Sequence, residues 1–292
     1  MHMEIKKMLH ILTDPLQYNF MQRSILIAVL IGLLCSIIGS YLMVQRLALL
    51  GDAISHSVMP GLAIAFSLGI PMIVGALSAA ILSTIIITWI KTESPLKEDT
   101  AIGIVFASFF AIGIILISLI QKNNKIDLNH FLFGNILSVS MEDVINTSLI
   151  FGLVITITIG LYKELLFFTF DSGGAQVLGL PIKQLNFSLM TLITLTTVAS
   201  MKVVGVVLVL ALLIIPSASA YLLVDRLHQI MTLGASIGIL SSVTGMYLSY
   251  YWNIPSGPAI VLIATIMFMM AFSIHKLKYF LTSNKPSITK KN

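Results

Sequence analysis

The chain has 292 residues, of which 57% are hydrophobic and only 10% carry a charge. The mean hydropathy is +1.00, and soluble domains carry about 25% charged residues, so a soluble globular protein is excluded and an integral membrane protein is indicated. The net charge of +5 is spread over loops and the tail, where it bears on membrane topology and argues against nucleic-acid binding.

The N-terminal region and the single cysteine exclude several features of the protein. Residues 1–20 lack a compact apolar core and a small-residue cleavage site, so we expect no cleaved signal peptide and a short interfacial helix instead. Cys35 lies in an apolar run, so no disulfide can form within the chain and a thiolate metal site is disfavoured. A GxxxxGK[ST] run is absent, and therefore we expect no P-loop and no enzymatic activity of this chain.

The apolar runs predict an all-α fold class, a polytopic membrane helical bundle with eight or nine transmembrane helices in one domain over residues 1–292. The expected spans are 24–44, 53–70, 71–90, 101–120, 144–162, two spans within 186–224 that turn near 202–205, one span that ends at 252, and 259–275. The apolar piece 130–140 is too short to span and is a candidate re-entrant segment.

Basic residues predict the orientation. They occur in the 91–100 loop, in 163–183, in the 225–229 loop and in a basic tail over 276–292. The positive-inside rule places these segments in the cytoplasm of a bacterial cell, with the protein in the inner (plasma) membrane. Nine spans then leave the N-terminus outside although it carries Lys6, Lys7 and Arg23, so the span count stays open.

The most unusual stretch is residues 46–66, RLALLGDAISHSVMPGLAIAF, which carries three ionisable residues between two apolar runs. Asp52 and His56 are four residues apart, so on a helix they share one face, about 6 Å apart along the axis. Pro60 and Gly61 follow within two turns and predict a bend or break. Ionisable groups beside a broken helix in a membrane protein indicate a functional site.

Two interpretations of this pair stay open from the residues alone. In the structural one, Asp52 caps the second span and His56 bonds a neighbouring carbonyl. In the functional one, a carboxylate oxygen and an imidazole nitrogen replace part of the hydration shell of a divalent cation, and Asp52 offsets its charge. Oxygen and nitrogen ligands without a thiolate or a His-rich loop favour manganese over zinc, whose sites gather more His or Cys.

Four motifs in order resemble the permease subunits of ATP-binding-cassette importers for manganese, zinc and iron, with a lean towards the manganese-type members. They are LLGDAISHSVMPGLAIAF at 49–66, EDTAIGI at 98–104, LFGNIL at 132–137 and LLIIPSASAYLL at 212–223. The resemblance covers about residues 22–274. It implies the vitamin-uptake-type importer fold, a homodimer, a cytoplasmic ATP-binding subunit that hydrolyses ATP, an extracytoplasmic metal-binding protein, surrounding membrane lipid and no permanently bound cofactor.

The resemblance also assigns residues. Asp52 and His56 match the family's metal-handling pair. Residues 163–183 match its cytoplasmic coupling helix, with an interfacial linker as the alternative; the matching positions are Lys163, Glu164, Phe170, Asp171, Ala175 and Gly179. Gly173 and Gly174 depart from the pattern, because two glycines inside a helix cost roughly 2 kcal/mol, and the helix is expected to begin after them. The residues expected to line the pathway or break helices are Gly51, Ser55, Pro60, Gly61 and Pro216.

Other residues support weaker expectations. Asp99 is interpreted as a helix cap or an ATPase-facing residue, and Lys202 as a turn residue that reaches water. His130, Glu142 and Asp143 are interpreted as a solvated loop, or as residues that receive metal at the outer face. Two other function classes stay open: a secondary metal transporter or channel, which needs no coupling segment, and an intramembrane hydrolase, for which one Asp–His pair is thin support.

Overall fold

The computed structural model describes residues 13–121 and 136–283, and every regular element in these ranges is helical. This part of the chain contains nine helical segments that are long and apolar enough to cross a membrane. They confirm the all-α class and give the higher of the two expected span counts. The spans are α2 (Asn19–Gln45), α3 with α4 (Leu49–Ser57 and Met59–Leu68), α5 (Met72–Glu93), α6 (Glu98–Gln121), α8 (Met141–Gly160), α11 (Ile182–Val204), α12 (Val206–Leu223), α13 (Leu227–Trp252) and α14 (Ser256–Ser283).

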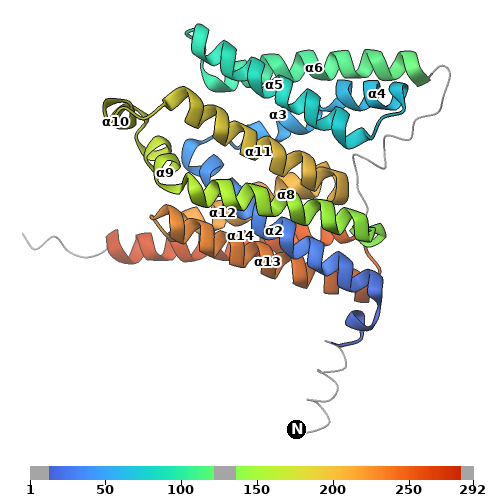
Figure 1. Ribbon diagram of the computed structural model, residues 1–292. Helices are drawn as coiled ribbons and strands as arrows, with labels where there is room; N and C mark the ends of the chain where they lie inside the picture. The colour runs from blue at the N-terminus through green and yellow to red at the C-terminus, as the bar shows by residue number, and fades with distance from the viewer. Residues whose placement is uncertain (1–12, 122–135, 284–292) are drawn as a thin grey trace, which may run out of the picture.

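The spans form two groups with α11 between them (Figure 1). In one group α2 packs against α12 and α13, and α14 covers those two helices. In the other group α3 and α4 contact both α5 and α6, which also contact each other. Helix α11 contacts α5 and α3 on one side and α2, α8 and α12 on the other, so it joins the groups.

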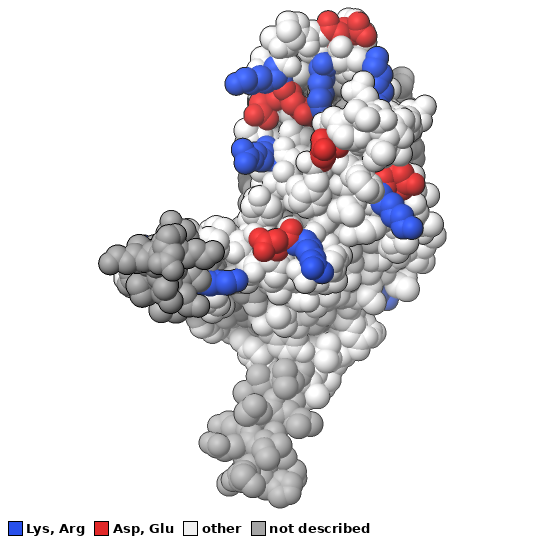
Figure 2. Space-filling model, turned by 90° about the vertical axis from the view of Figure 1, so that its left-hand side faces the viewer, with Lys and Arg blue, Asp and Glu red and all other residues white. Residues whose placement is uncertain are grey.

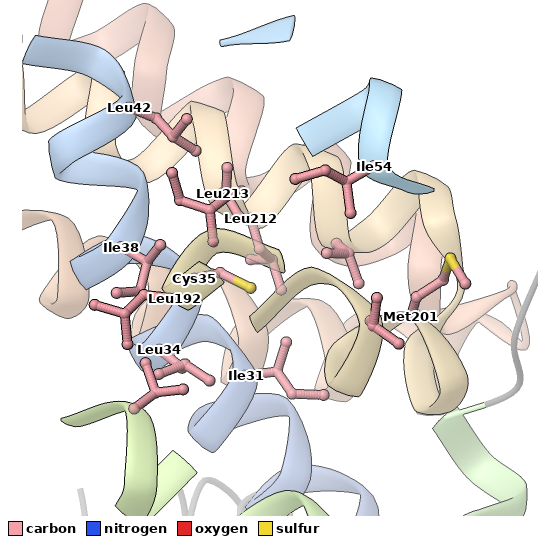
Figure 3. Close-up of a cluster of buried hydrophobic side chains, with 14 of the residues drawn as sticks. Ile31, Leu34, Cys35, Ile38, Leu42, Ile54, Leu192, Met201, Leu212 and Leu213 are labelled. Atoms are coloured by element: carbon pink, nitrogen blue, oxygen red, sulfur yellow. The ribbon is translucent and has the colours of Figure 1, made fainter. Parts of the chain in front are cut away.

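Apolar side chains of α2 form the centre of the first group. Figure 3 shows Ile31, Leu34 and Ile38 of α2 in one buried cluster with Leu192 of α11 and Leu213 of α12. Lipid tails are as apolar as these side chains, so close packing rather than the hydrophobic effect holds such helices together. Small residues at the crossings make such close packing possible.

Glycines allow several helices to approach closely. A Cβ placed on Gly39 of α2 would lie 1.9 Å from the carbonyl oxygen of Leu213, and one on Gly61 of α4 would lie 2.0 Å from that of Gly75 in α5. Small residues at four-residue spacing do not always mark a crossing: Gly103, Ala107 and Ala111 on α6 are exposed, and a Cβ on Gly103 would meet no atom within 4 Å.

The helical bundle has one charged end. Helix α14 ends there, beside the short helices α9 (Tyr162–Phe170) and α10 (Ser172–Val177) and the α5–α6 turn, whereas α2 begins at the opposite end (Figure 1). Figure 2 looks onto this end and shows Lys, Arg, Asp and Glu side chains distributed across it. Within the described residues, every Lys and Arg except Arg23 and Lys202 lies at this end, which the positive-inside rule predicts to be cytoplasmic.

Three predicted segments need correction or lie partly outside the described ranges. Residues 1–12 are outside, and the rest of the expected interfacial helix is the 3-10 helix η1 (Pro15–Gln17), followed directly by α2. The candidate re-entrant segment is described only from residue 136, where η2 (Ile136–Ser138) packs on α2 and the Ile136 carbonyl accepts a hydrogen bond from Ser24 Oγ at 2.8 Å. The predicted tail begins later than expected, because α14 continues to Ser283.

Candidate metal site

The second span is interrupted near its middle. Helix α3 ends at Ser57 and α4 begins at Met59, with Val58 between them. Proline has no N–H, so Pro60 cannot donate to the carbonyl of His56, four residues earlier, but it fits the first turn of a new helix. The predicted break is therefore present, two residues before Pro60. Gly61 has a different role, since it permits the close crossing of α4 with α5.

Asp52 and His56 face each other on α3. The distance from Asp52 Oδ1 to His56 Nε2 is 3.5 Å, and the two side chains are 46% and 29% exposed. Ala48 occupies the N-cap position of α3, where no side chain caps the helix, and Asp52 lies inside the first turn and does not cap it. His56 Nδ1 is buried and has no hydrogen-bond partner among the described residues. The contacts that the structural interpretation requires are thus absent from this part of the chain.

A small cavity lies beside the pair, between α3 and α6. Its volume is about 170 Å³, and it is lined by Asp52, Asp99 and Phe106, with Leu49, Ala53, Ile102 and Gly103 completing the wall. Asp99 is in the first turn of α6, where an acidic residue is favourable, and it also lines this cavity. From the sequence, Asp99 was expected to cap a helix or to face the ATPase, and its place beside Asp52 was not predicted.

Two phenylalanines of α6 lie against the His56 ring. The ring centroids of Phe106 and Phe110 are 5.7 Å and 5.4 Å from that of His56, with interplanar angles of 64° and 79°. Neither residue was predicted from the sequence to belong to the site. Their only signal was the four-residue spacing that places two aromatic side chains on one face of a helix.

The pair alone gives an incomplete ligand set. Within residues 13–121 and 136–283, no group of three or more His, Cys, Asp and Glu side chains is placed to hold a metal ion. Divalent cations take four to eight ligands in proteins. For a cation at this position, Asp52 and His56 would offer one oxygen and one nitrogen, and further ligands would have to come from outside the described residues, from water or from another chain.

The other residues expected to line the pathway belong to α3 and α12. Gly51 packs near Leu210 and Leu213 of α12, and Ser55 Oγ donates to the Gly51 carbonyl at 2.9 Å. Pro216 is buried inside α12, which continues through it without interruption. Of the two roles expected for Pro216, a helix break is therefore wrong, and a position along the pathway stays a prediction. Proline is tolerated inside membrane spans because neighbouring groups satisfy the freed carbonyl.

The segment over 163–183 is two short helices. Helix α9 ends at Phe170, and Asp171 caps α10 by accepting a hydrogen bond from the Gly174 N–H at 2.8 Å. Gly173 and Gly174 therefore lie inside α10, and the expectation that the helix begins after them is wrong. The cap offsets part of the cost of the two glycines. Gly179 has a φ of +78°, in the left-handed region that favours glycine.

The two helices present apolar side chains at the charged end of the bundle. Val177 is 88% exposed and Leu178 is 67% exposed. They line a cavity of about 830 Å³ together with Phe170 and with Asp225 and Arg226 of the α12–α13 loop. Lys163 is also exposed, Glu164 is half-buried, and Ala175 is fully buried and anchors α10. An exposed apolar patch of this kind indicates a protein-binding surface.

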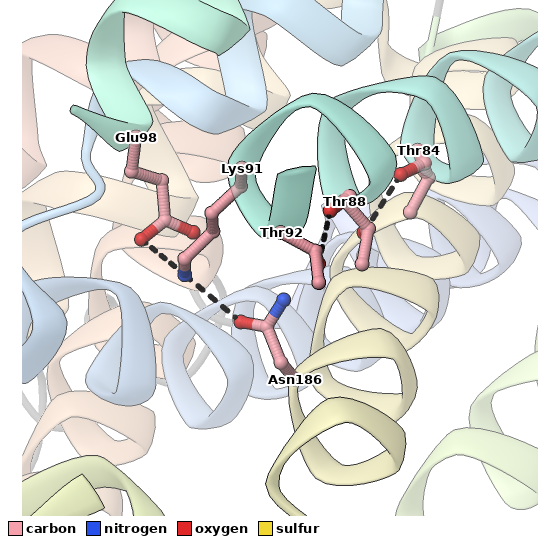
Figure 4. A network of polar contacts seen from close by, with 6 residues as sticks. All are labelled: Thr84, Thr88, Lys91, Thr92, Glu98 and Asn186. Atoms are coloured by element: carbon pink, nitrogen blue, oxygen red, sulfur yellow. Dashed lines mark hydrogen bonds and ion pairs between the residues drawn. The ribbon is translucent and has the colours of Figure 1, made fainter. Parts of the chain in front are cut away.

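A polar network ties three spans at the same end (Figure 4). Lys91 at the end of α5 forms an ion pair with Glu98 of α6 and donates to Asn186 Oδ1 of α11 at 3.2 Å. A cavity of about 510 Å³ separates this network from α9, since Lys91, Glu98 and Thr169 all line it.

At the opposite end, Lys202 forms an ion pair with Asp143 at 2.9 Å and joins α11 to α8. Lys202 therefore lies within a helix and does not form a turn. Asp143 belongs to a capping box with Ser140 at the start of α8, so the expected solvated loop is part of that helix. His130 lies outside the described residues.

The architecture defines a class. Nine spans, one of them interrupted beside an Asp–His pair, and a helical pair exposed at the charged end describe the membrane permease of a transporter. The profile of the ABC 3 transport family matches residues 17–275. The chain belongs to the ABC 3 transport family, and its apolar helices fit a multi-pass permease of a bacterial inner membrane.

Related proteins agree with this assignment. The manganese transport system membrane protein MntC of Listeria monocytogenes is 41% identical over 273 residues, 94% of this chain and 97% of that protein. The chelated iron transport system membrane protein YfeD of Yersinia pestis is 37% identical over 268 residues, 92% of this chain and 90% of that protein. Among solved structures, PsaBC from Streptococcus pneumoniae in complex with Fab superposes with a TM-score of 0.79 and 37% identity, covering 91% of this chain and 95% of that one.

Proposed function

We propose that this chain is the transmembrane subunit of an ATP-driven divalent-metal importer whose cargo is manganese. The single observation that carries the proposal is the Asp52–His56 pair, partly exposed on an interrupted span with 3.5 Å between carboxylate and imidazole. The sequence is 41% identical to a manganese transport system membrane protein over 94% of the chain, which supports manganese as the cargo. Zinc and iron remain the alternative cargoes within the family.

The ligand chemistry suits reversible binding. Manganese accepts carboxylate oxygen and imidazole nitrogen, and neither holds it as tightly as thiolates hold softer metals. Asp52 supplies negative charge where a bare dication in a membrane span would be costly. A homodimer with a two-fold axis beside α3 would bring a second Asp–His pair to the same place, and water would complete the coordination.

The energy has to come from another subunit, because the sequence contains no P-loop motif. The surface of α9 and α10 is suited to such a partner, because Phe170, Val177 and Leu178 expose apolar area at the charged end. In this proposal a cytoplasmic ATP-binding subunit docks on residues 163–183, and an extracytoplasmic metal-binding protein delivers manganese at the opposite face. The whole chain then acts as one transmembrane permease domain.

Metal uptake in cells that lack and regain the chain tests the proposal. Wild-type protein should restore manganese uptake more than zinc or iron uptake. Asp52→Asn and His56→Gln should each lower it by at least about tenfold at equal membrane levels, as loss of metal ligation predicts. The matched control is Glu93→Gln, the same acid-to-amide change at an exposed helix end, which should retain full uptake.

Three results would count against the proposal in distinct ways. Full manganese uptake by both site variants would reject Asp52 and His56 as the site. Restoration of zinc or iron uptake in place of manganese uptake would show that the cargo is that other metal. Uptake that persists when the partner ATPase cannot hydrolyse ATP would indicate a secondary transporter or channel.

A further inference from the structure

The orientation of the His56 ring requires an explanation. A metal-binding histidine usually donates its other N–H to a carboxylate, a carbonyl or water, and that hydrogen bond fixes the ring. His56 Nδ1 is buried without a hydrogen-bond partner in the described part of the chain. His56 Nε2 is 3.5 Å from Asp52 Oδ1, too far for a strong hydrogen bond. Hydrogen bonds therefore do not hold the imidazole in place.

Aromatic packing holds it instead. The rings of Phe106 and Phe110 both stand steeply to the imidazole, at 64° and 79°, with centroids within 6 Å. Edge-to-face geometry at this separation is the preferred arrangement of aromatic rings. The two phenyl rings are also nearly parallel to each other, at 17° and 5.9 Å, so they contact the imidazole as one unit.

Helix α6 fixes these two rings relative to the interrupted span. A Cβ on Gly113 would lie 2.5 Å from Met59 Cβ and 3.2 Å from Pro60 N, so α6 packs directly on the start of α4. Nearer its N-terminus, Ile102 and Val105 are buried. The side chain of Phe106 also forms part of the wall of the cavity that Asp52 lines. The rings thus lie beside the metal pair on a helix that is anchored at both ends of the contact.

We infer that Phe106 and Phe110 are positioning residues, which hold the His56 imidazole with Nε2 directed at Asp52 so that the pair is preorganised for a divalent cation. The inference rests on the proposed role of Asp52 and His56 in metal binding. Without the rings, the imidazole turns about its side-chain bonds, and the pair has to be reassembled for each cation. The affinity for metal then falls, while the transport rate at saturating metal is retained.

The test compares ring removal with ring retention in the complete transporter, reconstituted in proteoliposomes. Phe106→Leu and Phe110→Leu keep a large apolar side chain but remove the ring, and Phe110→Tyr keeps the ring. Each Leu variant should raise the manganese concentration for half-maximal uptake by about three- to tenfold, the range expected for one lost aromatic contact, with an unchanged maximal rate. Phe110→Tyr should remain near wild type.

The matched control is Phe109→Leu. Phe109 is on the same helix and is also half-buried against the core, but among the described residues its ring makes no recorded contact with His56. Its half-saturating concentration should stay unchanged. An equal rise in Phe109→Leu, or a lower maximal rate without a change in half-saturation, would show a general packing role and overturn the inference.

A His56→Gln background separates this inference from the proposed function. In that background Phe106→Leu should add nothing to the half-saturating concentration, because there is no imidazole left to orient. An unchanged half-saturation in His56→Gln alone would reject the metal site itself. A large shift in His56→Gln without any shift in the Leu variants would reject only the positioning role of the two phenylalanines.

Discussion

At the Asp52–His56 pair, one carboxylate and one imidazole are available to a cation without full burial. Even with a second pair from a homodimer, water would complete the coordination at the proposed site, and a transported ion has to bind well enough to enter but weakly enough to leave. A complete cage of protein ligands would bind the ion too tightly for release. The small number of ligands is therefore consistent with transport and argues against storage of a metal.

The oxygen–nitrogen composition of the pair leads to a prediction about selectivity. Asp52→His replaces an oxygen ligand by a second nitrogen, and zinc prefers such sites more strongly than manganese does. We expect the ratio of zinc to manganese uptake to rise several-fold in competition with both metals. Asp52→Asn is the control, and it should lower the uptake of both metals. A ratio that stays at the wild-type value in Asp52→His would assign selectivity to another component.

At the scale of helices, α10 depends on its cap. Asp171→Ala removes the acceptor for the Gly174 N–H, which should cost about 1 kcal/mol and unfold a helix that contains two glycines. We expect less ATPase subunit to co-purify with this variant. Asp171→Ser keeps a capping oxygen without the charge and should restore binding. Failure of Asp171→Ser to do so would indicate that the carboxylate contacts the partner directly.

The crossing of α4 and α5 gives a prediction about stability. Gly61→Ala and Gly75→Ala each place a methyl group about 2 Å from a carbonyl oxygen of the facing helix. Overpacking of this kind costs about 1–3 kcal/mol, so the melting temperature of the purified protein in detergent should fall. Gly152→Ala on α8 is the matched control, because nothing lies within 4 Å of its Cβ position. It should melt at or above the wild-type temperature.

The apolar runs of the sequence predicted the spans, but they did not predict every residue at which a helix begins or ends. The run of apolar residues marked α8, but the helix begins at Met141 because Ser140 and Asp143 form a capping box that was not recognised. Pro60 correctly indicated a break, whereas Pro216 did not, because tertiary contacts decide whether a freed carbonyl can be satisfied. The Asp52–His56 pair followed from helical spacing alone.

Contacts between residues far apart in the sequence could not be predicted from its pattern. Phe106 and Phe110 are about fifty residues from His56, and their contact depends on how α6 crosses the interrupted span. The pairing of Lys202 with Asp143 likewise joins distant segments. Periodicity describes one helix at a time and cannot predict which faces of two helices meet.

For the whole molecule, the odd number of spans places the two ends of the described chain on opposite sides of the membrane. This predicts the accessibility of single cysteines to a membrane-impermeant maleimide. Leu178→Cys, on the α10 side, should react only in inside-out vesicles, and Glu142→Cys only in right-side-out vesicles or intact cells. The unsubstituted protein is the control, since Cys35 is buried and should not react. Reaction of both variants from the same side would disprove the topology.

Helix α14 has 28 residues, so at 1.5 Å per residue it is about 42 Å long. The hydrocarbon layer is about 30 Å thick, and a helix of this length projects beyond it. Lys276 and Lys278 lie in its last turns and are exposed. Each lysine near an anionic leaflet contributes about 1 kcal/mol of attraction. We therefore expect an anionic leaflet to hold this end of the permease more firmly than a neutral one.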